Sequence, residues 1–127
     1  MANVLVDTSV MVDFLRRKDS AQSPYIVLLE QGNEPCISIV THTELFSGNS
    51  VWEHDYMLHT VQELCKNITI FPLDTALSEQ SGKLRARYDL DFADAIIAAT
   101  ALKHSLPLAT LNASDFRRVP DLKLFRM

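Results

Sequence analysis

Five short runs of Val, Ile and Leu restrict the fold of this sequence more than any other feature. They are nearly continuous rather than alternating with polar residues, which is typical of strands that helices cover on both faces. The runs lie at about residues 3–6, 36–40, 68–71, 107–110 and 122–125. We therefore predict five buried strands.

Helical segments separate these runs, so strands and helices alternate along the chain. The segments lie at about residues 8–18, 22–31, 42–48, 51–65, 75–88, 92–105 and 113–117. The residues expected at the N-caps are Thr8, Thr41, Thr75 and Asn112. Alternation of this kind requires parallel strands joined by right-handed crossovers. The predicted fold class is α/β, a three-layer α/β/α sandwich with a mostly parallel central sheet of about five strands.

Length and composition fit one ordinary globular unit. A chain of 127 residues with 47% hydrophobic and 22% charged residues can bury a single core. We expect one domain over residues 1–127, because no repeat or linker interrupts it. No apolar run is long enough to cross a membrane, and no basic leader precedes the first strand. We therefore expect a cytoplasmic protein that has no membrane partner and keeps Cys36 and Cys65 as buried thiols.

Four acidic residues occur where ligands of open α/β sheets collect, near the carboxyl ends of strands. Asp7 directly follows the first strand, and Glu44 lies about one turn into the helix after the second. Asp94 lies near the start of an Ala-rich helix, and Asp115 follows the fourth strand. One such acid is weak support for a site, but four at matched positions are stronger. They predict an acidic cluster at this sheet edge.

Asp94 carries the most information, because its helix is apolar enough to pack directly on the sheet. A buried carboxylate is paired with a cation or coordinates a metal. No Lys or Arg stands three or four residues from Asp94 to provide a local partner. The alternative is that Asp94 is a first-turn acid favoured by the helix dipole. Asp7 and Asp115 could likewise have no role other than capping a helix.

The sequence resembles the PIN domains, and in particular the VapC-type toxins of toxin–antitoxin pairs. The resemblance spans nearly the whole chain, in LVDTSVMVDFL, TELFSG, DAIIAATAL and LATLNASDF. It implies Mg²⁺- or Mn²⁺-dependent cleavage of single-stranded regions of RNA, of the transfer or ribosomal class. The acidic residues that it implies are Asp7, Glu44, Asp94 and Asp115, and the polar auxiliaries are Ser9, Thr110 and Asn112.

Hydrolysis of a phosphodiester needs an activated water and neutralisation of the phosphate charge, which divalent ions supply. Because Mg²⁺ takes only one or two carboxylates directly, four acids suffice for one or two ions. We assign Asp7 and Asp94 as principal ligands. Glu44 and Asp115 would bind a second ion or orient water. Asp91 is an additional acid to which we assign no role.

The resemblance also implies a small antitoxin partner and a homodimer. Large apolar residues of the early helices and of segment 51–65 could form a surface for either, although each could instead be core. These residues are Val12, Phe14, Leu15, Tyr25, Leu28, Leu29, Trp52, Tyr56, Met57 and Val61. A partner arginine would suit the acidic pocket, because its planar fork matches carboxylates.

The net charge of −4 argues against a protein that grips duplex nucleic acid through a wide basic surface. Basic residues that could contact RNA phosphates, or only face solvent, are Arg16, Arg17, Lys18, Lys83, Arg85, Arg87, Arg117 and Arg118.

Other functions fit the sequence less well. The four histidines show no zinc-binding spacing. A receiver domain needs two adjacent acids after the first strand, and the phosphatase group needs DxDx[TV], whereas this chain has DTSVMVD. A non-toxin PIN nuclease in RNA processing and a non-enzymatic module with an acidic pocket stay open.

Overall fold

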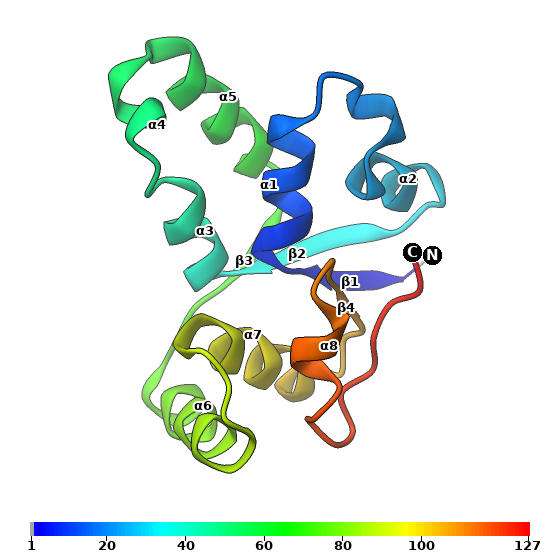
Figure 1. The fold of residues 1–127 in the computed structure, drawn as a ribbon, viewed down its shortest axis with the longest axis vertical. Coiled ribbons are helices and arrows are strands. Elements are labelled where there is room, and N and C mark those ends of the chain that lie inside the picture. Colours follow the sequence, from blue (N-terminus) through cyan, green and yellow to red (C-terminus); the bar gives the residue numbers. More distant parts are fainter. Residues whose placement is uncertain (1) are drawn as a thin grey trace.

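A parallel sheet lies between two layers of helices in the computed structural model, which describes residues 2–127 (Figure 1). Its strands are β1 (Asn3–Val6), β2 (Glu34–Ser38), β3 (Thr69–Phe71) and β4 (Leu108–Ala109). They are ordered β3-β2-β1-β4, and every neighbouring pair is parallel. This arrangement confirms the predicted α/β/α sandwich. It also brings all strand carboxyl ends to one edge.

Helices cover both faces of the sheet (Figure 1). On one side lie α1 (Thr8–Arg16), α2 (Pro24–Glu30), α4 (Asn49–Glu53) and α5 (Asp55–Cys65), with a 3₁₀ turn at Ser20–Gln22. On the other side lie α6 (Thr75–Tyr88), α7 (Phe92–Lys103) and α8 (Ala113–Phe116). Helix α3 (Ile39–Leu45) follows β2 at the carboxyl edge.

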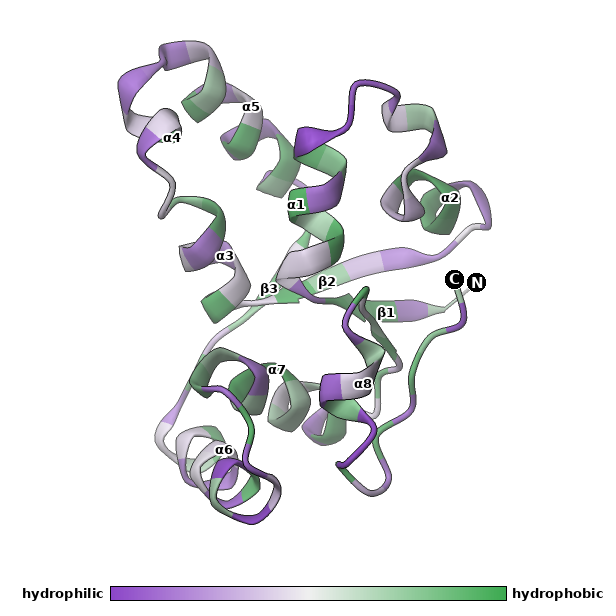
Figure 2. Ribbon diagram, viewed as in Figure 1, coloured by the Kyte–Doolittle hydropathy of each residue, from purple (hydrophilic) through white to green (hydrophobic). Residues whose placement is uncertain are grey.

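Each central strand contributes side chains to two separate cores. Val4 and Val6 of β1 pack with Val10 and Met11 of α1, whereas Leu5 packs with residues of α7. The hydropathy colouring shows apolar residues on both sides of the sheet (Figure 2). The burial of both faces explains why the strands read as continuous apolar runs.

The fifth expected strand, at residues 122–125, is reduced to a single parallel bridge between Leu124 and Leu108. The backbone of Leu108 donates to Lys123 O at 2.8 Å and accepts from Phe125 N at 2.7 Å. A longer ladder does not form because β4 itself has only two residues. The sheet therefore has four strands.

Three expected N-caps were wrong, because a residue before each threonine caps the helix. Asp7 accepts from the backbone N–H groups of Ser9 and Val10 and caps α1. Ser38 caps α3, and Asp74 caps α6. Helix α3 therefore begins at Ile39, inside the segment predicted as strand, and ends earlier than expected.

Two further boundaries differ from the prediction. The expected helix at 51–65 is divided between α4 and α5, because the backbone of His54 is extended. Asn112 does precede α8, but its side chain makes no cap hydrogen bond in the described structure.

Cys36 and Cys65 are buried and unpaired in the described structure, as predicted. Burial raises the pKa of both thiols. Within residues 2–127, no helix combines the length and apolar character needed to cross a membrane.

Candidate functional site

Asp7 lies at the centre of the carboxyl edge, because it directly follows β1 between β2 and β4. Its side chain is only 3% exposed. One carboxylate oxygen, Oδ1, accepts from the backbone N–H of Ser9 at 2.9 Å and from the Ser9 hydroxyl. The other, Oδ2, accepts from the hydroxyl of Thr110 at the end of β4. Residues that follow two neighbouring strands, β1 and β4, therefore hold this carboxylate in a fixed orientation.

The predicted auxiliary residues form the support around Asp7. The Ser9 hydroxyl oxygen accepts from Leu111 N at 3.0 Å, and that of Thr110 accepts from Asn112 N at 2.9 Å. Asn112 thus contributes its backbone N–H to this network. Each hydroxyl donates toward Asp7 while a backbone N–H fixes its oxygen, and this is how outer residues orient a ligand.

Glu44 is exposed and reaches the same edge from α3. Its Oε1 accepts from the Thr8 hydroxyl at 2.6 Å, and the Thr8 oxygen lies 3.1 Å from Oγ1 of Thr41. Thr8 and Thr41 were predicted only as helix caps. Their actual positions connect Glu44 to the start of α1, beside Asp7. No pattern in the sequence distinguishes this role from helix capping.

Asp94 is half-buried in the first turn of α7, and its surroundings raise its pKa from 3.8 to about 6. Burial is the largest cause, followed by the negative charges of Asp91, Asp7, Asp115 and Glu44. The structure thus brings all four predicted acids into electrostatic contact, together with Asp91, the extra acid. Among residues 2–127, none of these five carboxylates has a Lys, Arg or His partner within 4.0 Å.

The donor set fits a hard divalent cation. All five groups offer carboxylate oxygens, which suit Mg²⁺ and Mn²⁺, and no cysteine or histidine belongs to the group. In the described residues, no three acidic, His or Cys side chains stand close enough to form a ready metal cluster. Unpaired carboxylates at one edge repel one another. A bound cation would remove that repulsion.

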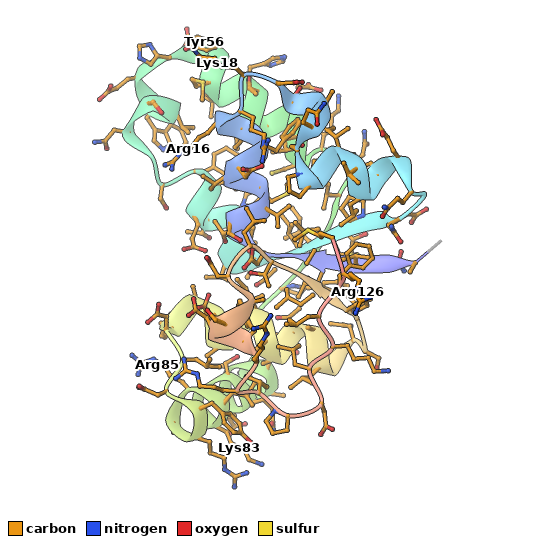
Figure 3. The ribbon with its side chains drawn as sticks, turned by 45° about the vertical axis from the view of Figure 1, so that its right-hand side comes forward. Arg16, Lys18, Tyr56, Lys83, Arg85 and Arg126 are labelled. Atoms are coloured by element: carbon orange, nitrogen blue, oxygen red, sulfur yellow. The ribbon has the colours of Figure 1, made fainter. Side chains whose placement is uncertain are left out.

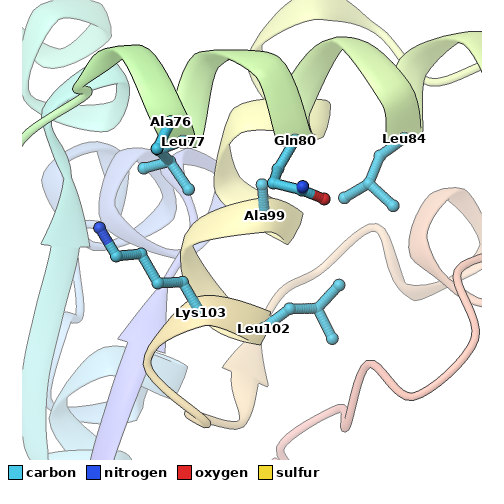
Figure 4. Close-up of a pocket in the computed structure, with 7 residues that line it drawn as sticks. All are labelled: Ala76, Leu77, Gln80, Leu84, Ala99, Leu102 and Lys103. Atoms are coloured by element: carbon cyan, nitrogen blue, oxygen red, sulfur yellow. The ribbon is translucent and has the colours of Figure 1, made fainter.

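A hollow of about 340 Å³ between α6 and α7 is separate from this site (Figure 4). Its lining is mainly apolar and contains none of the acids: Ala76, Leu77, Gln80, Leu84, Ala99, Leu102 and Lys103. Its Lys103 lies 3.5 Å from Asp74, outside the acidic cluster. The chemistry therefore belongs to the carboxyl edge rather than to this hollow.

Known proteins resemble the chain over its whole length. The family model "PIN domain" matches residues 4–122. Ribonuclease VapC1 of Methanocaldococcus jannaschii is 32% identical over 97% of this chain and 85% of its own length. A toxin–antitoxin complex from Klebsiella pneumoniae contains a chain 28% identical, with a TM-score of 0.75 and coverage of 98% of this chain and 99% of that one.

VapBC2 from Rickettsia felis, bound to a promoter DNA fragment, has the same fold. Its TM-score is 0.79 at 20% identity, with coverage of 100% of this chain and 99% of that one. The PIN match begins within β1 and includes the other three strands and every acid of the cluster. The similarity to Ribonuclease VapC1 extends over 97% of this chain. The chain therefore belongs to the PIN domain family, and within it to the VapC ribonucleases.

Proposed function

We propose that this protein is an endoribonuclease that uses Mg²⁺ or Mn²⁺ to cleave single-stranded regions of RNA, as the toxin of a toxin–antitoxin pair. One observation carries the proposal. Burial and four neighbouring carboxylates raise the pKa of Asp94 at the carboxyl edge of a parallel sheet, and no described basic side chain lies within 4.0 Å of any of the five. Natural proteins seldom keep such a repulsive cluster without function.

We assign the four acids different roles according to their burial. Asp7, which is buried and held by Ser9 and Thr110, and Asp94, which is half-buried, would be the principal ligands. Glu44 and Asp115 are exposed and would hold a second ion or orient the attacking water. When bound, the cation neutralises phosphate charge and favours the hydroxide form of water. The chain's own contribution is to fix these oxygens before substrate arrives.

Cleavage of a mixed pool of transfer and ribosomal RNA tests the activity. The purified protein is incubated with the pool in Mg²⁺, in Mn²⁺ and in chelator, and the cut ends are mapped. Discrete cuts that chelator removes are expected, and zinc should not be required. Cleavage that persists in chelator would exclude metal-dependent hydrolysis. No cleavage under any condition would favour a binding module.

Loss of one supporting hydroxyl should weaken catalysis without unfolding the protein. Thr110→Val keeps the shape of the side chain but leaves Asp7 Oδ2 without its donor. Because outer residues of metal sites contribute about 10- to 100-fold to affinity or activity, we expect a loss in that range. Thr110→Ser should retain most activity. The cleavage rate is measured as a function of Mg²⁺ concentration. Equal curves for Thr110→Val and Thr110→Ser would contradict a supporting role for the Thr110 hydroxyl.

The surface predicted for a partner is smaller than the sequence indicated. Tyr25, Leu28 and Val61 are buried in the core. Val12, Phe14 and Leu15 are half-buried and pack against that core. For these six side chains the structure therefore bears out the alternative that the sequence left open, that they belong to the core or pack against it.

Exposed aromatic residues remain on α4 and α5. Trp52 is 65% and Tyr56 is 69% exposed, and Leu29 lies exposed on α2. Solved toxin–antitoxin complexes with this fold support an antitoxin as the partner. A homodimer over the same residues stays a prediction.

Co-expression with the small reading frame beside the gene tests the partner. We expect its product to co-purify and to suppress cleavage, with an apolar segment on the exposed aromatics and an arginine at the acidic cluster. Trp52→Ala with Tyr56→Ala should weaken capture by more than tenfold, because buried aromatics dominate interfaces. Sedimentation of the free parent and the free double variant distinguishes weaker capture of the antitoxin from loss of a homodimer. If no neighbouring product binds, the nuclease could still be a non-toxin RNA-processing enzyme.

A further inference from the structure

A buried hydroxyl on α3 forms its hydrogen bond with a distant part of the chain. Thr41 is 0% exposed, so its hydroxyl needs a partner inside the protein. Thr100, which is buried to the same degree, donates to the carbonyl of Ile96 in its own helix at 2.7 Å. Thr41 instead bonds to Thr8, 33 positions away, at 3.1 Å. Its hydroxyl is therefore directed out of α3 and toward the start of α1.

The chain of hydroxyls continues from Thr8 to Glu44. The Thr8 hydroxyl oxygen lies 2.6 Å from Oε1 of Glu44. A hydroxyl has one hydrogen to donate, and an ionised carboxylate has none. Thr8 therefore donates to Glu44 and accepts from Thr41. In this order, a residue that solvent does not reach determines how an exposed carboxylate is held.

Glu44 has no cation to hold it in place. An exposed glutamate ordinarily samples several rotamers, and within residues 2–127 no Lys, Arg or His lies within 4.0 Å of this one. Arg16 and Lys18 stand at and just beyond the opposite end of α1 from Thr8 (Figure 3). A neutral hydroxyl therefore orients the Glu44 carboxylate, and its negative charge stays available for a ligand.

Two consecutive residues at the start of α1 support two acids of the cluster. The Ser9 hydroxyl donates to Asp7, and the Thr8 hydroxyl donates to Glu44. Ser9 is anchored in turn by the loop after β4, and Thr8 is anchored by Thr41 of α3. The same arrangement, a hydroxyl fixed from behind by a second donor, thus occurs on both sides of the start of α1.

We propose that Thr41 is a positioning residue that acts through Thr8 to hold the Glu44 carboxylate in place for a divalent cation. The inference rests on the proposed metal-dependent function and adds to it a buried residue that touches neither the cation nor the RNA. Residues that orient a ligand in this way increase cation affinity, because the ligand is already ordered when the ion binds. Loss of the Thr41 hydroxyl should therefore weaken cation binding while the fold stays intact.

Thr41→Val removes the hydroxyl and keeps the shape of this buried side chain. Thr41→Ser retains a hydroxyl at the same position. Thr43→Val is the matched control, because Thr43 lies on the same helix but donates to Ile39 O at 3.1 Å, within α3. Thr8→Val, at a half-buried position, interrupts the same chain of hydroxyls outside the core. Circular dichroism verifies the fold of every variant.

Mn²⁺ binding to each purified protein, without RNA, is measured from the loss of the free-ion signal in electron paramagnetic resonance. Thr41→Val should weaken binding by about 2- to 12-fold, the fold-change that corresponds to the net contribution of one hydrogen bond. Thr8→Val should weaken binding by about 10- to 100-fold, the range for outer residues that contact a ligand. Thr41→Ser should recover most of the affinity, and Thr43→Val should bind within about twofold of the parent.

A Glu44→Gln background tests whether Thr41 acts through Glu44. If it does, the addition of Thr41→Val to Glu44→Gln should change Mn²⁺ binding no further, because residues that act through one another are not additive. A general weakening of the structure would instead add to the effect of Glu44→Gln. In cleavage assays, excess Mn²⁺ should restore the kcat of Thr41→Val toward that of the parent, and KM for RNA should stay unchanged.

Parent-like Mn²⁺ binding by a folded Thr41→Val protein, or by Thr8→Val if Thr41→Val does not fold, would overturn the inference and leave the metal-dependent nuclease intact. An effect of Thr41→Val that persists in full in Glu44→Gln would do the same. Mn²⁺ binding that depends on Thr41 through Glu44, in a protein that cleaves no RNA, would support the inference and overturn the proposed ribonuclease function. A parent that binds no Mn²⁺ would overturn both.

Discussion

Asp94→Asn should lower the cleavage rate by about 10³-fold or more while the protein stays folded. The substitution keeps the shape of the side chain but removes the charge that would bind a cation. A catalytic cation contributes several kcal/mol of transition-state stabilisation, and each 1.36 kcal/mol is tenfold in rate. Asp7→Asn should have a similar effect, because Asp7 is the most buried acid of the cluster.

Asp89→Asn is the matched control for this loss. Asp89 is exposed, caps the end of α6 at φ 52°, and does not contribute to the raised pKa of Asp94. Asparagine tolerates this left-handed backbone conformation, so the control changes the net charge equally without touching the cluster. Initial rates and circular dichroism are compared for all variants. Full activity in a folded Asp94→Asn protein would remove Asp94 from the site.

The sequence predicted the sandwich because hydrophobic periodicity depends on which faces are buried, and both faces of this sheet are. It placed the acids near one edge because parallel strands end together. It failed at the caps, because Asp7 and Ser38 precede threonines that could also cap a helix, and in each case the earlier residue accepts the cap hydrogen bond. Such choices involve about 1 kcal/mol each, too little for local sequence to resolve.

The Thr8–Glu44 contact needed the structure for a related reason. Thr8 and Glu44 are 36 positions apart and meet only because α3 turns back across the sheet edge. The motif around Asp94, in contrast, is short and local, so Asp94 could be identified as a candidate site residue from the sequence.

In the metal-free protein, Asp94→Asn should increase stability at neutral pH. The folded protein raises the pKa of Asp94 to about 6, so the folded state holds a proton more tightly than the unfolded state does. The stabilising effect of that proton is complete below the unfolded pKa of 3.8 and is lost as pH rises through about 6. At pH 7 the ionised carboxylate therefore destabilises the fold.

The size of this effect is about 1–2 kcal/mol once solvent screening of a half-exposed group is allowed for. The asparagine variant should melt about 3–8 °C above the parent at pH 7 in chelator, and the difference should shrink toward pH 4. Asp89→Asn should show no such pH-dependent gain.

Millimolar Mg²⁺ or Mn²⁺ should reverse the order of stability. A cation that binds only the folded site adds about 2.7 kcal/mol at 100 times its Kd. It would bind the ionised form of Asp94, so the parent should gain in melting temperature and Asp94→Asn should gain little. The measurement is a melting curve for each protein at pH 4, 5, 6 and 7, with chelator and with metal. If the melting temperatures of the two proteins changed in parallel under all conditions, Asp94 would neither repel its neighbours nor bind the cation. That result would contradict both the electrostatic repulsion within the cluster and the metal site.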